Sequence, residues 1–443
     1  MTPADRSATL GPQGPCSPGE RTLTEPLAPT HPPAPLRAHD LRGLVRLGFD
    51  ATAGVVDVVE NVHATIAARV LPVGRPSDER TRGITGWVYG AVRGVTRGLG
   101  RTTDALWAAL APGAPPEAAP SPARESLLAA LNGLCGDHLE RTGNPLAIPM
   151  TLRVGGRAVA PERWAAALPR PRRLLLQVHG LCMSDLQWSR RGHDHGLALA
   201  AALGFAPLHV HYNSGRHVAD NGADLCALLD RLLAGPAVAP ERLVIMGHSM
   251  GGLVARSAVH QAGLRGSPWL RHLSALVFLG TPHHGAPLER GGHRIDRLLG
   301  LHAFSVPFAR LGRARSAGIT DLRFGNLQRP PGGDRHRQRV DDRRPVPLPA
   351  GVPAYAVAAT RGATAGDLPS RLIGDGLVPL ASALGDHPDP RLALGIPAAN
   401  RWIAPSADHW DLLDRPDVLE RLLGWLGRPG RSRGRSSGAG QAA

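Results

Sequence analysis

One serine stands out among the residues of this sequence that could do chemistry. It is Ser249, within Gly-His-Ser-Met-Gly at residues 247–251, and the apolar run 243–246 precedes it. Apolar residues at 254 and 258 continue at a helical spacing. A strand that turns sharply into a helix holds a serine hydroxyl exposed at its tip, in the arrangement called a nucleophile elbow. The two glycines suit so tight a turn, because side chains there would collide. We therefore predict that Ser249 is a nucleophile.

A histidine and a carboxylate are expected to activate this serine, since a hydroxyl needs a base and the base needs orienting. In this arrangement both follow the serine in the order acid, then histidine, in loops after later strands. His409 follows the last predicted strand, residues 402–404, and Asp375 precedes that strand between two glycines. We predict that His409 is the base and Asp375 the acid. Asp367 and Asp386 lie in the same interval and remain competitors for the acid.

The oxyanion that forms during acyl transfer requires preorganised N–H donors. The first predicted donor is the backbone amide of Met250, directly after the serine. The second is expected in the loop after an early strand, residues 174–178, where we assign the amide of Leu181. His179 in that loop is expected to brace the backbone rather than to transfer a proton.

The elements that must position these residues alternate along the chain. Strands are predicted at 174–178, 206–212, 242–247, 275–279, 354–359 and 402–404, and a hairpin within 150–159. Helices are predicted at 193–203, 221–233, from the elbow to 262, near 380 and at 416–426. This alternation indicates an α/β fold in which helices cover both faces of a mostly parallel sheet.

The chain divides into four predicted regions. Residues 1–40 are rich in proline, which removes backbone donors and blocks helix, so we predict a disordered leader. Residues 41–140 form a helical extension, 141–428 the α/β domain, and 429–443 a second disordered tail. Within the domain, residues 287–349 are a long insert with helical apolar spacing.

The helical extension allows two interpretations. Residues 41–71 show an amphipathic pattern, and a second helix, 84–110, has glycine at positions 86, 90, 94 and 98. Such a face of small residues allows another backbone to approach closely, so the two helices are expected to form a hairpin on it. Alternatively residues 41–110, with arginine at 93, 97 and 101, form a basic element that lies on an anionic membrane surface.

Composition argues against several other functions. The formal net charge is +15, but all 51 basic residues are arginine and many lie in the predicted tails and loops, so no nucleic-acid partner is expected. The four cysteines lack metal-ligand spacing, and we predict neither a metal nor a cofactor. With no apolar signal segment and no run of 18 apolar residues, the expected location is cytoplasmic, with peripheral membrane association as an option.

Several motifs together resemble the α/β-hydrolase superfamily, and more narrowly bacterial triacylglycerol lipases and the lipase-like domain of GPI inositol-deacylases, which is called PGAP1-like. They are Val-His-Gly at 178–180, Tyr-Asn-Ser-Gly at 212–215, Gly-His-Ser-Met-Gly-Gly at 247–252, Gly-Thr-Pro-His-His-Gly at 280–285, Asp-Gly-Leu-Val-Pro at 375–379 and His-Trp-Asp-Leu-Leu at 409–413. The resemblance spans about residues 170 to 426. It implies an α/β-hydrolase fold and a Ser249–His409–Asp375 triad, while the elbow motif is shared by lipases, esterases, phospholipases and acyltransferases.

The function expected on this basis is hydrolysis of carboxylic esters of acyl lipids through an acyl-enzyme on Ser249, as in lipases and esterases. Two alternatives remain open: an acyltransferase that uses the same acyl-enzyme, and a membrane-associated scaffold with an inactive hydrolase domain. The insert 287–349 is expected either to act as a lid over an acyl pocket or to pack permanently as a cap.

Overall fold

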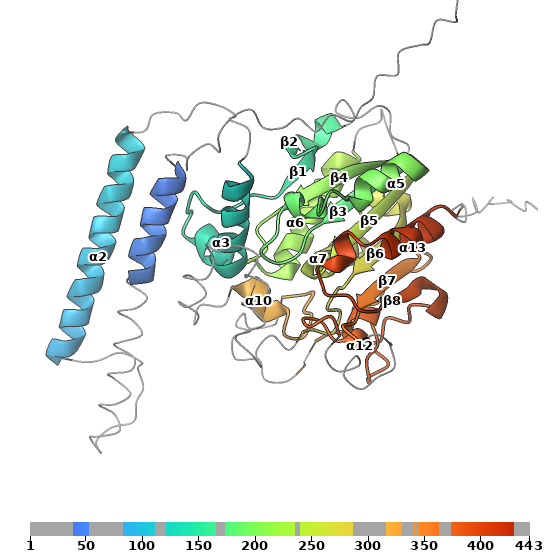
Figure 1. Ribbon diagram of the computed structural model, residues 1–443. Coiled ribbons are helices and arrows are strands. Elements are labelled where there is room, and N and C mark those ends of the chain that lie inside the picture. The colour runs from blue at the N-terminus through green and yellow to red at the C-terminus, as the bar shows by residue number, and fades with distance from the viewer. Residues whose placement is uncertain are drawn as a thin grey trace, which may run out of the picture.

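A computed structural model describes residues 39–52, 83–110, 121–164, 173–234, 240–286, 316–329, 341, 343–362 and 374–428. Its centre is an eight-stranded sheet of order β2-β1-β4-β3-β5-β6-β7-β8 (Figure 1). The strands are β1 (Thr151–Val154), β2 (Arg157–Val159), β3 (Arg173–Val178), β4 (Phe205–His211), β5 (Arg242–His248), β6 (Leu273–Leu279), β7 (Ala354–Ala359) and β8 (Arg401–Ala404). The six strands from β4 to β8 are parallel, and the β1–β2 hairpin adds antiparallel to β4. Each strand predicted from the sequence is present within a few residues of its expected bounds.

Helices cover both faces of the sheet. The helices α6 (Val218–Leu232) and α7 (Met250–Arg265) pack on one face, and α5 (His195–Leu203) and α13 (Pro416–Leu426) pack on the other. The short helix α12 (Leu380–Leu384) follows β7. Side chains of the fully buried strands alternate between the two faces, as the pleat requires. In β3, Leu174 and Leu176 therefore join the core with α6 and α7, while Leu175 joins the core with α5 and α13.

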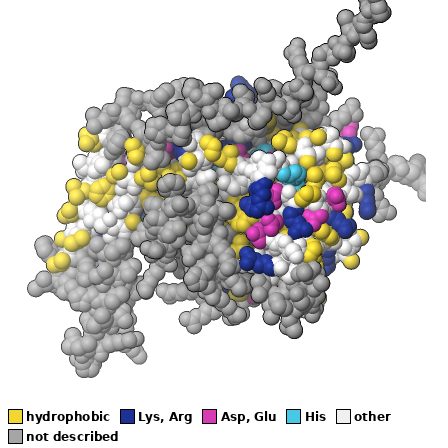
Figure 2. Space-filling model, viewed as in Figure 1, with side chains coloured by type: hydrophobic (Ala, Val, Ile, Leu, Met, Phe, Trp, Pro, Cys, Tyr) yellow, Lys and Arg dark blue, Asp and Glu magenta, His cyan; other side chains and the backbone are white. Residues whose placement is uncertain are grey.

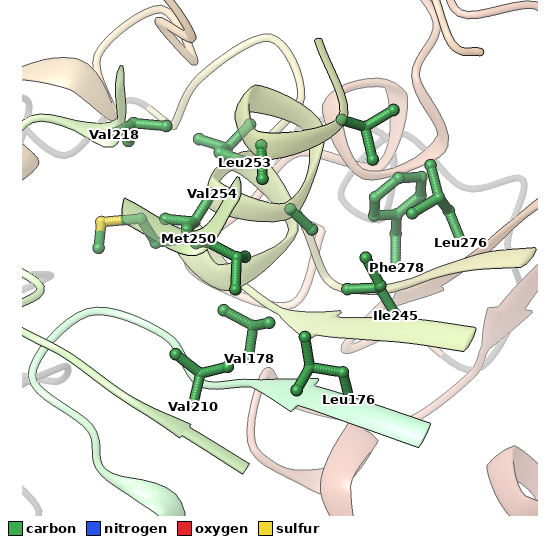
Figure 3. Packing of buried hydrophobic residues seen from close by; sticks show 14 of the residues in the cluster. Leu176, Val178, Val210, Val218, Ile245, Met250, Leu253, Val254, Leu276 and Phe278 are labelled. Atoms are coloured by element: carbon green, nitrogen blue, oxygen red, sulfur yellow. The ribbon is translucent and has the colours of Figure 1, made fainter. Parts of the chain in front are cut away.

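The core on the α6 and α7 side connects the central strands directly to the helix that follows the elbow. Figure 3 shows Leu176 and Val178 of β3 with Ile245 of β5, and Met250 and Leu253 of α7 in the same cluster. All five side chains are fully buried. The start of α7 is thus fixed by close-packed apolar side chains, which leaves little freedom for the turn that precedes it.

Two helices of the N-terminal extension pair with each other. The helix α2 (Gly83–Leu110) confirms the helix predicted at 84–110, and residues 39–52 form a helix beside it (Figure 1). Arg42 Nε lies 2.5 Å from Asp104 Oδ1, and Phe49 packs beside Gly100. Among the described residues, no atom lies within 4 Å of a Cβ built on Gly90, Gly94 or Gly98. The part of the first helix predicted at 53–71 lies outside the described residues, so the packing on the glycine face stays a prediction.

A third helix, α3 (Pro122–Arg141), lies between this pair and the sheet. Its Leu131 and Leu139 are buried with Leu146, and Leu44 and Leu47 of the first helix pack against them. The first helix begins at residue 39, where Asp40 is buried and pairs with Arg124 Nε at 2.6 Å.

The predicted tails and most of the insert belong to the part of the chain that the structure does not describe. Residues 1–38, 429–443 and the insert segments 287–315 and 330–340 lie outside the described residues. Of the insert, the helix α10 (Ala317–Asp321) is described. Ile319, Leu322 and Leu327 of this segment are buried in the domain core, so this part of the insert packs against the sheet domain. Whether residues 287–315 act as a lid stays an open prediction.

Candidate active site

Ser249 occupies the turn between β5 and α7 with a backbone conformation of φ 53° and ψ −126°. A positive φ is sterically costly for a residue with a Cβ, and such strain persists where the surroundings enforce it. The Ser249 N–H donates to the carbonyl of Leu279 at the end of β6, at 2.8 Å. A side chain at Gly251 would overlap the carbonyl oxygen of Val178, and one at Gly247 would overlap the amide of Gly252. The structure therefore has the elbow that the sequence predicts.

His409 and Asp375 form a buried pair after β8 and β7. His409 Nδ1 lies 2.6 Å from Asp375 Oδ2, and the two residues are 1% and 2% exposed. The other carboxylate oxygen, Oδ1, accepts the amides of Leu377 and Val378, each at 2.8 Å. These amides fix the carboxylate so that its second oxygen faces the imidazole. Flanking glycines make the loop possible, because Gly376 has a φ of 93°.

Neither competitor for the acid takes this position. Asp386 forms an ion pair with Arg401, whose Nη1 lies 2.6 Å from its Oδ1, at the protein surface. Asp367 lies outside the described residues. The pairing of Asp375 with His409 is the arrangement that the sequence order predicts.

The second nitrogen of His409, Nε2, is buried and makes no hydrogen bond within the part of the chain that the structure describes. A Cβ built on Gly280 would lie 2.9 Å from His409 Cε1. Gly280 directly follows Leu279, which accepts the Ser249 N–H. Ser249 and His409 are thus both held at the carboxyl end of β6, and Nε2 is available to accept a proton.

One predicted oxyanion donor directly follows the serine in the chain, and the other belongs to a loop that contacts the serine. Met250 is the first residue of α7, so its N–H has no partner within the helix. The loop that contains Leu181 follows β3, and a Cβ on Gly180 would lie 3.0 Å from Ser249 Cβ. No hydrogen bond to the Leu181 N–H is present among the described residues. This placement is compatible with both assignments, which stay predictions.

His179 holds the backbone of this loop. Its Nδ1 lies 2.9 Å from the carbonyl of Gly180, and its Nε2 lies 3.4 Å from the amide of Tyr212. The Tyr212 hydroxyl in turn donates to the carbonyl of His179 at 2.7 Å. Burial lowers the pKa of His179 to about 4, so the ring is neutral, with one nitrogen donating and the other accepting. These contacts support a bracing role.

Sequence reasoning missed the contact between His248 and the loop that carries His409. His248 Nε2 donates to the backbone carbonyl of His409 at 3.1 Å, and the two ring centroids are 4.7 Å apart. Burial, and then the neighbouring His409, lowers the pKa of His248 well below its ordinary value. The neutral imidazole before the nucleophile thus anchors the base. The elbow motif carries no signal for this contact, because it joins a ring nitrogen to a backbone carbonyl 161 positions away.

Comparison with known proteins gives one family match. Residues 223–304 match the PGAP1-like alpha/beta domain, and this segment contains the elbow. The comparison with curated protein sequences gave no significant match.

Solved structures with a similar fold include three that act on esters or thioesters by their descriptions. A Bacillus licheniformis lipase, BlEst2, is 18% identical with a TM-score of 0.37, and the match covers 58% of this chain and 93% of that one. The Pyrococcus furiosus esterase Pf2001 is 14% identical, with a TM-score of 0.34 and coverage of 58% and 79%. YbtT, a type II thioesterase of the yersiniabactin pathway, is 15% identical, with a TM-score of 0.35 and coverage of 59% and 92%. At this level of similarity none of these activities transfers to the present chain.

The assignment therefore rests on the sheet, the elbow and the family match. The parallel strands carry the serine, the acid and the histidine at the carboxyl ends of β5, β7 and β8, in the chain order typical of one superfamily. Together with the PGAP1-like match, these features place the protein in the α/β-hydrolase superfamily.

Proposed function

We propose that the protein is a serine hydrolase that cleaves carboxylic esters of acyl lipids through an acyl-enzyme on Ser249. The observation that carries this proposal is the buried His409–Asp375 pair, with a separation of 2.6 Å between Nδ1 and Oδ2. This pair leaves the buried Nε2 of His409 without a partner among the described residues, at the same sheet edge as the strained serine.

In the proposed reaction, the Ser249 hydroxyl attacks the ester carbonyl while His409 Nε2 accepts its proton. Asp375 stabilises the imidazolium through Nδ1. The carbonyl electron pair moves onto oxygen, and the amides of Leu181 and Met250 stabilise this oxyanion. The oxyanion collapses and breaks the ester C–O bond, and His409 returns the proton to the departing alcohol. Water then attacks the acyl-enzyme in the same way and releases the fatty acid and Ser249.

The proposal of an acyl-lipid substrate is supported by the PGAP1-like match over residues 223–304 and by the lipase-like motifs. Its test is turnover of p-nitrophenyl esters from short to long acyl chains, with Ser249→Ala as the control. We expect hydrolysis that increases with chain length and is lost in the variant. Preference for the shortest chains would contradict the lipid substrate, and full turnover by a folded Ser249→Ala would contradict the serine mechanism.

The same acyl-enzyme makes acyl transfer to an alcohol the main alternative. Product analysis with and without an added acceptor alcohol separates the two reactions, because a hydrolase releases free acid in both cases. An inactive scaffold, the other alternative, would not react covalently with a fluorophosphonate.

We also propose that helix α2 brings the enzyme to an anionic lipid surface. Val88, Val92, Val95, Leu99 and Leu106 form an apolar ridge on one face of α2 and are between 43% and 63% exposed. Figure 2 shows hydrophobic side chains gathered along α2, at the left of the molecule. Among the described residues, no helix has the length and hydropathy of a membrane span.

Charge favours an anionic lipid as the partner of this ridge. The helix contains three arginines and one acidic residue, Asp104, which is already paired with Arg42. Arg97 and Arg101 are exposed away from the ridge, as on the polar face of helices that lie in a membrane interface. Such arginines attract anionic headgroups at the surface.

Liposome flotation tests this contact. The intact protein is expected to float with vesicles that contain anionic phospholipid, and Val95→Asp with Leu99→Asp is expected to abolish flotation. Leu264→Asp is the matched control, because Leu264 is 75% exposed on a different helix. If the ridge variant floats normally, the proposal is wrong. If it instead converts a dimer to a monomer and the intact protein does not float, the ridge binds a second copy.

A further inference from the structure

The helix α3 contacts the loop that carries a proposed oxyanion donor. Its helical geometry is interrupted at Cys135, where φ is −142° and ψ is 22°. Before this kink, Gly133 faces Cys182, the residue after Leu181. A Cβ on Gly133 would overlap Cys182 Sγ and would lie 2.8 Å from the Cys182 backbone nitrogen. The loop after β3 is therefore seated directly on the backbone of α3.

A second loop, which follows β4, is seated on the same kink. Asn213 Nδ2 donates to the carbonyl of Gly136 at 2.8 Å, and a Cβ on Gly215 would overlap the carbonyl oxygen of Asn132. Both Asn213 and Gly215 are buried. These contacts use carbonyl groups near the kink, where the helix cannot satisfy all of its own acceptors.

A hydrogen bond joins the two loops. The Cys182 N–H donates to Ser214 Oγ at 3.0 Å. Cys182 has a φ of 59°, a conformation that a residue with a side chain rarely adopts unless its contacts hold it there. On its other side, Gly133 is held by Ser316 Oγ, which donates to the Gly133 carbonyl at 2.6 Å. The backbone of Leu181–Cys182 is thus clamped between α3 and Ser214.

We propose that Gly133 and Ser214 are positioning residues that hold the Leu181 amide in place for the oxyanion. This inference rests on the proposed function, in which Leu181 is a donor. An amide donor must meet the oxyanion within a narrow range of distance, and removal of one donor typically costs roughly 10²- to 10³-fold in kcat. The absence of a side chain at Gly133 sets this position, because a Cβ would force the Cys182 backbone to shift.

Gly133→Ala is therefore expected to lower kcat by about 10- to 100-fold, part of the loss that follows removal of a donor. KM is expected to stay nearly constant, since the amide acts on charge that develops only in the transition state. The measurement is kcat for ester hydrolysis per active site, with sites counted by complete titration with a fluorophosphonate. Because only folded, reactive protein is counted, any unfolded protein does not affect the value of kcat. Arg141→Ala, at the exposed end of α3, is the control and is expected to match the parent enzyme.

Adding Cys182→Gly to Gly133→Ala supplies a rescue test. It removes the side chain that overlaps the new Cβ, and glycine accepts the φ of 59° without strain. The overlap of the new Cβ with the Cys182 backbone nitrogen, at 2.8 Å, remains in the double variant, so we expect it to recover only part of the lost kcat. If Gly133→Ala does not fold, Ser214→Ala takes its place. This variant removes the acceptor of the Cys182 N–H, and it is expected to lower kcat without changing KM.

The outcomes separate this inference from the proposed function. A parent enzyme that neither turns over esters nor reacts with the fluorophosphonate contradicts the proposed function itself. An active parent whose folded Gly133→Ala and Ser214→Ala variants keep full kcat overturns the positioning role. So does a kcat loss in Gly133→Ala that comes with an equally large rise in KM, since that result indicates general damage to the domain.

Discussion

At the scale of single residues, the two nitrogens of His409 have different surroundings. Nδ1 faces Asp375 at 2.6 Å, and Nε2 is buried without a partner among the described residues. The carboxylate fixes the tautomer in which Nε2 carries no proton, and this tautomer is the one that can act as a base. Asp375 is itself fixed by the amides of Leu377 and Val378. The orientation of the base therefore depends on a carboxylate that cannot easily turn away.

Asp375→Asn tests this dependence. An amide can donate to Nδ1 and so favour the wrong tautomer, and we expect kcat for ester hydrolysis to fall by roughly 10³- to 10⁴-fold with little loss of folding. Steady-state kinetics and a melting curve measure the two effects. Asp386→Asn is the matched control, because that aspartate pairs with Arg401 at the surface. Activity within tenfold of the parent enzyme in Asp375→Asn is incompatible with its proposed role.

At the scale of elements, the elbow depends on the contact between α7 and β3. Gly251 faces the carbonyl oxygens of Val178 and His179, and both belong to the backbone of a central strand and its loop. Because β3 has neighbours on both sides in the sheet, this backbone cannot move away. The same helix also contains Gly263, where a Cβ would meet no described atom within 4 Å.

Alanine at these two glycines is expected to have opposite effects. Gly251→Ala is expected to lower the free energy of unfolding by about 1–3 kcal/mol, the usual cost of overpacking. Gly263→Ala is expected to raise it by up to about 1 kcal/mol, since alanine favours a helix. Urea unfolding of both variants and the parent measures the difference. Equal stabilities for the two variants would show that the elbow tolerates a side chain.

Sequence patterns at this scale predict the regular elements better than their departures from regularity. The strands and the elbow follow from apolar runs and from glycines with a local steric purpose, such as Gly247 and Gly251. The kink of α3 at Cys135 does not follow from such a pattern. It depends on the loops around Cys182 and Asn213, which are 47 and 78 positions away in the chain and pack on the helix there. The anchoring of His409 by His248 is similarly a product of tertiary contact.

At the scale of the whole molecule, the domain buries several neutral histidines. Burial lowers the pKa of His179 and of His195 to about 4, and it lowers the pKa of His248 and His283 well below the ordinary value of 6.5. The unfolded chain therefore binds more protons than the folded protein at pH values between about 4 and 6.5. Stability then rises with pH in this window and is lost as the pH falls.

This linkage predicts a steep loss of stability in weak acid. One such histidine contributes a slope of at most about 1.4 kcal/mol per pH unit, so several together should exceed that value between pH 4 and 6.5. Urea unfolding at closely spaced pH values gives the slope, and a pH range above 7 serves as the comparison. A slope at or below that of one group would contradict the burial of these imidazoles as neutral rings.

The central claim is that Ser249 is the nucleophile and His409 its base. Reaction of the intact protein with a fluorophosphonate, followed by peptide mapping, tests it most directly. We expect one adduct on Ser249, no adduct in Ser249→Ala, and far slower labelling in His409→Ala. An adduct on another residue, or no adduct on the folded parent protein, would contradict it.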